Sequence, residues 1–178
     1  MLFKERSPVS RRALLSSAIS LALAGLVRTE GEAADKQGFP LVAKAAQLPI
    51  LGVGHPATDV WSYNDRVPGP VIRIPVGERV RFMVKNELSE ATTVHWHGIR
   101  LPNEMDGVPG LTQPPIAPGE VFLYDFTPPD AGTFWYHPHA NSLEQIGRGM
   151  AGALIIEEAK PVPVDRDIVW MLGDWRLT

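Results

Sequence analysis

The chain has 178 residues, of which 44% are hydrophobic and 21% charged, a composition typical of a globular protein with one domain or little more. Its formal charge of −3 argues against nucleic-acid binding, because phosphate backbones are bound by clustered Lys and Arg. The chain has no Cys, which excludes disulfides, zinc–thiolate sites, iron–sulfur clusters and copper–thiolate centres within it.

Residues 1–34 are typical of a cleavable export signal. A basic start precedes an uncharged run at residues 13–27. This run is too short to span a bilayer, because a membrane-spanning helix needs about 20 apolar residues. Arg11 and Arg12, in Ser-Arg-Arg-Ala-Leu-Leu, resemble a twin-arginine signal, which implies a periplasmic protein without a stable membrane anchor. The alternative is an amphipathic first helix of the domain.

Residues 38–160 predict an all-β domain, because short runs of β-branched and aromatic residues alternate with turns rich in Pro and Gly. This pattern favours an antiparallel β-sandwich or barrel. Strands are expected at residues 41–46, 59–63, 71–74, 79–86, 92–97, 121–126, 133–137 and 153–157. One short helix is expected at residues 142–148, before Gly149.

Residues 161–178 have the composition of a linker followed by an apolar run. We expect residues 168–172 to form the first strand of a second domain that this sequence does not contain, and hence a truncated or partial chain. Such a strand would leave an unpaired edge, which promotes association.

Two histidine pairs give the strongest functional signal, His95-Trp96-His97 and His137-Pro138-His139. In a strand, residues i and i+2 point to the same side, so each pair presents two imidazoles together. Pro138 has no N–H and places the second pair at a strand end or edge. Imidazole binds copper, zinc, iron and nickel, so these residues predict a metal site without choosing the metal.

The fifth histidine, His55, lies alone in a Gly-His-Pro loop and is expected to be solvated.

The motifs HWHG at 95–98, GTFWYHPH at 132–139 and GMAGALII at 149–156 resemble the first cupredoxin domain of the multicopper oxidases, the laccase-like enzymes. Shorter matches lie at residues 61–64, 68–73, 106–108, 112–113 and 118–119. The resemblance covers about residues 40–175 and implies a cupredoxin-like Greek-key β-sandwich.

The resemblance also implies half of a trinuclear copper cluster that reduces O2 to water while a substrate is oxidised. On the matching positions, His95 would ligate the type 2 copper, His97 and His137 would share one type 3 copper, and His139 would bind the other. Asp106 matches an acidic residue that helps to move protons to the type 2 copper in related bacterial enzymes. The alternative for Asp106 is a turn former, because Asp-Gly is a common turn dipeptide.

The chain departs from the family pattern in lacking the H-x-x-H-x-H and H-C-H motifs, which belong to C-terminal cupredoxin domains. Without Cys a type 1 copper site cannot form, so this chain alone should be inactive. Two alternatives remain: a stand-alone periplasmic copper-binding module without turnover, and a zinc hydrolase that uses the histidine pairs. The zinc alternative lacks support from an H-x-H-x-D-H or H-E-x-x-H motif.

Overall fold

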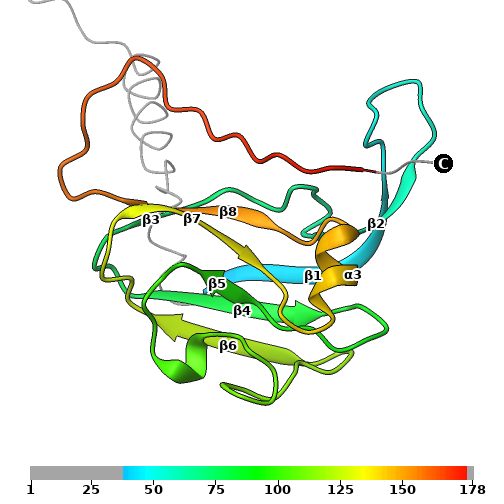
Figure 1. The fold of residues 1–178 in the computed structure, drawn as a ribbon, viewed down its shortest axis with the longest axis horizontal. Helices are drawn as coiled ribbons and strands as arrows, with labels where there is room; N and C mark the ends of the chain where they lie inside the picture. The colour runs from blue at the N-terminus through cyan, green and yellow to red at the C-terminus, as the bar shows by residue number, and fades with distance from the viewer. Residues whose placement is uncertain (1–37, 176–178) are drawn as a thin grey trace, which may run out of the picture. The chain divides into compact units, whose positions relative to one another are not determined.

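The computed structural model describes residues 38–175, so the predicted export signal at residues 1–34 lies outside the described residues. The described chain forms a β-sandwich with one short α-helix and one 3-10 turn (Figure 1). The strands are β1 (Phe39–Leu48), β2 (Thr58–Tyr63), β3 (Ile72–Pro75), β4 (Val80–Asn86), β5 (His95–His97), β6 (Val121–Phe126), β7 (Gly132–His137) and β8 (Gly152–Glu157). The 3-10 turn η1 covers Asn103–Met105 and the helix α3 covers Ser142–Gly147.

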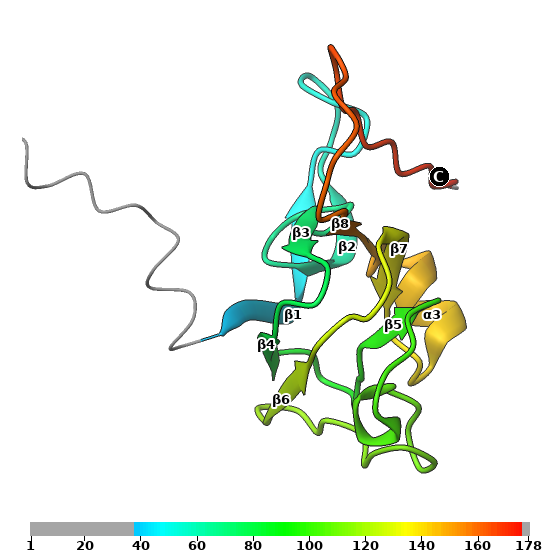
Figure 2. The same cartoon turned by 90° about the vertical axis from the view of Figure 1, so that its left-hand side faces the viewer.

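Two four-stranded sheets form the layers of the sandwich, in the orders β2-β1-β4-β6 and β3-β8-β7-β5 (Figure 2). The pairs β1–β4 and β3–β8 are parallel and the others antiparallel. The predicted β-sandwich is therefore confirmed, and its antiparallel pairing holds for four of the six strand pairs but not for β1–β4 and β3–β8. A tight hairpin makes neighbours antiparallel, whereas β1 reaches β4, and β3 reaches β8, only after a long crossover.

The core lies between the sheets and follows the alternation of the strands. Val80, Phe82 and Val84 of β4 are buried, while Met83 between them is exposed. Trp96 of β5 is fully buried, and its ring centroid lies 4.3 Å from that of Phe82. Because Trp96 points into the core, both histidines beside it point to the opposite side of the sheet.

The eight strands and the helix expected between residues 38 and 160 are all present, most with shifted ends. The largest shift is at β5, which begins at His95 and not at residue 92. The preceding residues make other contacts. The main chain of Thr92 pairs with that of Ile116, and the Thr92 hydroxyl donates to Gln145 Oε1 at 2.7 Å. The Val94 N–H donates to the Tyr124 hydroxyl at 2.9 Å. Residues 92–94 are thus fixed without extending the ladder between β5 and β7.

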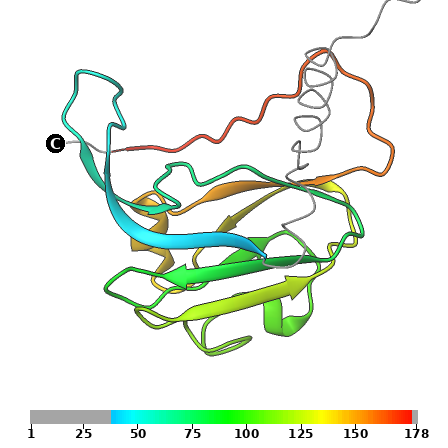
Figure 3. The same ribbon diagram turned by 180° about the vertical axis from the view of Figure 1, so that it is seen from behind.

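Residues 158–175 join neither sheet, and the chain loops away from the strands after β8 (Figure 3). The strand expected at residues 168–172 is not formed, and the side chains of Trp170 and Leu172 are 83% and 91% exposed. A strand needs a neighbouring strand to accept its hydrogen bonds, and this segment has none within the described residues. An ion pair of 2.9 Å between Arg73 and Asp167 links the middle of this segment to β3.

Within residues 38–175, no helix is both long and apolar enough to cross a membrane.

Candidate metal centre

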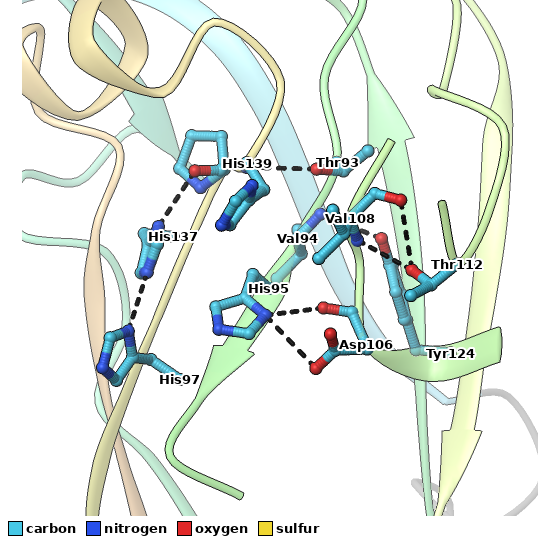
Figure 4. Close-up of polar contacts among 11 residues, drawn as sticks. Thr93, Val94, His95, His97, Asp106, Val108, Thr112, Tyr124, His137 and His139 are labelled. Atoms are coloured by element: carbon cyan, nitrogen blue, oxygen red, sulfur yellow. Dashed lines mark hydrogen bonds and ion pairs between the residues drawn. The ribbon is translucent and has the colours of Figure 1, made fainter. Parts of the chain in front are cut away.

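The two histidine pairs meet because β5 and β7 are antiparallel neighbours. The register places His95 opposite His137 and His97 opposite Trp135. The side chains of His95, His97 and His137 lie close together, and His139 follows just after β7 (Figure 4). Donor atoms of three residues, His95, His97 and His137, lie within 4.8 Å of one another.

His97 and His137 present their ring nitrogens to each other, with 3.2 Å between His97 Nδ1 and His137 Nε2. Two imidazole nitrogens that bind one ion at about 2.0–2.1 Å in tetrahedral geometry lie roughly 3.3 Å apart. The other ring nitrogen of His137, Nδ1, lies 2.9 Å from the Pro138 carbonyl oxygen and donates to it. This bond leaves Nε2 of His137 free to bind a metal, so the pair fits one shared ion.

His95 is oriented by the residue that follows η1. Its Nδ1 lies 2.7 Å from the main-chain oxygen of Asp106 and 3.4 Å from carboxylate Oδ1 of the same residue. A ligating histidine commonly donates its second ring N–H to such an oxygen, which fixes the tautomer and leaves Nε2 for the metal. Gly107 allows this approach: its φ is +79°, and a Cβ there would lie 2.0 Å from the Val94 oxygen.

His139 is exposed and does not belong to the three-histidine group. Its ring centroid lies 5.2 Å from that of His95 and 6.1 Å from that of His137. Its main-chain N–H donates to the Thr93 hydroxyl at 3.1 Å, which ties the second pair to the segment before the first pair. The four predicted histidines therefore surround one small region of the sheet face.

Burial lowers the pKa of His137 to about 4, and the neighbouring imidazoles of His95, His97 and His139 add to the shift when they are charged. His137 is therefore neutral at pH 7, which is the form that binds a metal.

Gln145 of α3 is a structural residue of the site that the sequence analysis missed. It is fully buried and donates from Nε2 to Glu90 Oε1 at 2.7 Å and to the Ala91 carbonyl at 2.9 Å, besides accepting from Thr92. These bonds join the helix after His139 to the segment before His95. A polar residue in a short predicted helix gives no sequence signal of this role.

His55 is exposed in the loop between β1 and β2, as expected. Asp106 contacts His95 through both its main chain and its carboxylate, and its part in proton transfer stays a prediction.

A multicopper oxidase family model matches residues 45–161. The chain is 42% identical to copper resistance protein A of Escherichia coli over 147 residues, which are 80% of this chain and 24% of that protein. It is 40% identical to laccase-1 of Botryotinia fuckeliana over 144 residues, which are 79% of this chain and 25% of that protein. The chain thus spans about a quarter of the length of these curated relatives.

Solved structures give the same result. A multi-copper oxidase from Pseudomonas thermotolerans matches 69% of this chain and 30% of its own, with 48% identity and a TM-score of 0.66. The multicopper oxidase from Campylobacter jejuni, described as a metallo-oxidase, matches 68% of this chain and 26% of its own, with 38% identity and a TM-score of 0.62. These matches confirm the expected cupredoxin-like β-sandwich.

Proposed function

Because this chain belongs to the multicopper oxidase family, whose members bind copper and oxidise substrates, we propose that it supplies half of a trinuclear copper cluster. The observation that carries the proposal is the 3.2 Å approach of His97 Nδ1 and His137 Nε2, within a group of three histidines. In the complete enzyme, this cluster would reduce O2 to water while a reducing substrate loses electrons one at a time.

We assign the four histidines to the copper ions of such a cluster. His97 and His137 would share one type 3 ion, and His139, which stands outside the three-histidine group, would bind the other. His95 would bind the type 2 ion through Nε2, because its Nδ1 is engaged by Asp106. Bound copper would supply the one-electron steps needed for O2 reduction.

The residues around the histidines orient their rings, and one of them could transfer protons to the site. The Asp106 carbonyl fixes the ring of His95, and the Pro138 carbonyl fixes that of His137. The Asp106 carboxylate is 35% exposed and lies 3.4 Å from His95 Nδ1. Because it contacts both solvent and the site, we propose that it accepts protons from water and delivers them toward the type 2 copper.

Electrons must enter from elsewhere, because the chain has no Cys with which to form a type 1 copper site. We propose that cupredoxin domains outside this sequence supply the type 1 copper and the remaining cluster ligands, and that this chain alone has no oxidase turnover. In this proposal residues 38–160 form the first domain and residues 161–178 connect it to the next. Residues 1–34 would direct export to the periplasm by the twin-arginine route.

Copper titration of the purified chain tests the proposal. We expect one or two Cu(II) ions per chain and no intense blue absorption, because that absorption needs a copper–thiolate bond. Replacing His95 and His97 together with Ala should reduce the stoichiometry, whereas the control His55→Ala should change nothing. Undiminished copper uptake by the double variant would refute the site, and uptake of zinc in preference to copper would favour a hydrolase.

A further inference from the structure

Trp135 lies against both histidines assigned to the shared copper ion. It precedes His137 by two residues on β7, so the two side chains share one face, and it is registered opposite His97 of β5. Its ring centroid lies 4.0 Å from that of His137, with an interplanar angle of 29°. The distance to the His97 ring is 5.0 Å, with an angle of 34°. One indole therefore stacks on the His137 ring and makes a tilted contact with the His97 ring.

This contact restrains His97, the less supported ring of the His97–His137 pair. His97 is exposed, and the polar contact recorded for its ring within the described residues is the one to His137 Nε2. His137, in contrast, is buried and bonded to the Pro138 carbonyl. An aromatic plane along one side of the His97 ring limits its rotation, and this keeps Nδ1 turned toward His137.

We propose that Trp135 is a positioning residue for the shared copper ion: its indole holds the rings of His97 and His137 so that their donor nitrogens face each other. The inference rests on the proposed copper site. Outer contacts that orient metal ligands typically change metal affinity by about 10–100-fold when they are removed. Trp135 itself offers no metal-binding atom, since its indole nitrogen carries a hydrogen and only donates.

Trp135 lies outside the buried core, so replacing it should affect the metal site more than the fold. Its side chain is half-buried and does not belong to the buried core cluster, which contains Trp96. It lines a groove of about 880 Å³ together with Val67, Pro68 and Ala151. A smaller side chain at residue 135 would therefore enlarge a groove that already exists.

The test compares Cu(II) affinity of the full chain with that of three variants. Trp135→Leu keeps an apolar side chain but removes the aromatic plane, and we expect its affinity to fall about 10–100-fold. Trp135→Phe keeps an aromatic plane, so it should retain most of the affinity that Trp135→Leu loses. Its Cu(II) electron paramagnetic resonance spectrum should match that of the unsubstituted chain. The matched control is Trp170→Leu in the exposed tail, which should leave affinity and spectrum unchanged.

The results distinguish failure of the proposed copper site from failure of the role proposed for Trp135. If the unsubstituted chain binds no copper, the proposed copper site itself is refuted. If the unsubstituted chain binds copper and Trp135→Leu binds it equally well with the same spectrum, Trp135 is not a positioning residue. Failure of the Phe variant to recover affinity would also contradict a role based on the aromatic plane.

A second measurement covers the case in which Trp135→Leu does not fold. The chain is labelled with 5-fluorotryptophan, and its fluorine NMR signals are assigned with Trp135→Phe and Trp170→Leu. Cu(II) broadens signals of nearby nuclei, so the Trp135 signal should disappear as the first ion binds, while the Trp170 signal persists. A Trp135 signal that stays sharp with copper bound would place the indole away from the bound ion and overturn the inference.

Discussion

The strands β4 and β5 show two ways in which this molecule holds a strand in place. β4 pairs with β1 over five registered residues and with β6 over six, and its buried and exposed residues alternate. β5 has three residues and one neighbour, β7, and the segment before it is fixed by a main-chain pair with Ile116 and by side chains from elsewhere in the chain. The ladder thus stabilises the sandwich, whereas long-range side-chain contacts set the geometry of the histidines.

The largest effect on stability should come from the buried face of β4. Phe82 of β4 is fully buried and contacts the rings of Trp96 and Phe126, so Phe82→Ala should lower the free energy of unfolding by about 3–5 kcal/mol. Urea unfolding measures this change. Copper stoichiometry should be unchanged while the variant remains folded.

The control for Phe82 is its neighbour Met83, whose side chain is 40% exposed on the outer face of the same strand. Met83→Ala should lower the free energy of unfolding far less than Phe82→Ala does. Equal losses in the two variants would contradict the description of β4 as a strand with one buried face.

A smaller loss should follow removal of the Gln145 contacts. Gln145→Leu would leave the Thr92 hydroxyl and the Ala91 carbonyl without this partner in the interior, at a cost of about 1–3 kcal/mol in the free energy of unfolding. Copper affinity should fall as well, because the segment before His95 loses one of the contacts that hold it. Urea unfolding and copper titration measure the two effects.

Gln47 provides a matched comparison for Gln145, because its side chain makes one exposed hydrogen bond to Asp59. Gln47→Leu should change the free energy of unfolding by no more than about 0.5 kcal/mol and leave copper binding intact. If Gln145→Leu behaved in the same way, α3 would have no part in holding the site.

Acid should destabilise the metal-free protein through His137. Its pKa is lowered to about 4 in the folded chain, against about 6.5 when unfolded. The unfolded chain therefore binds a proton between these values that the folded chain does not, and stability falls as the pH drops through this window. From pH 7 to 4.5 we expect a loss on the order of 2 kcal/mol, measured by urea unfolding.

Two variants separate this loss from other titrations. His137→Asn should reduce the dependence between pH 6.5 and 4, because the titrating group is gone. Arg79→Gln should not, because Arg79 lowers the pKa of the Asp125 carboxyl below 3.8, and the stability from that pair is lost only at lower pH. An unchanged slope for His137→Asn would show that His137 does not titrate in this way.

The sequence could predict the strands because burial alternates along them, and it could predict that each histidine pair points to one side. It could not predict that His97 and His137 face each other, because this depends on the register of β5 against β7. Trp135 was missed for the same reason. The early start expected for β5 at residue 92 failed because the main chain of Thr92 pairs with Ile116 and the Val94 N–H bonds to the Tyr124 hydroxyl, so neither residue joins β7.

The central claim is that His97 and His137 share one copper ion, and counting the ions bound by single and double variants tests it most directly. Copper per chain is measured after equilibrium dialysis for His97→Ala, His137→Ala and the variant that combines them. If one ion is shared, each single variant should lose the same ion, and the combined variant should lose no more than either alone. Losses that add in the combined variant would show that the two histidines bind separate ions and would contradict the account.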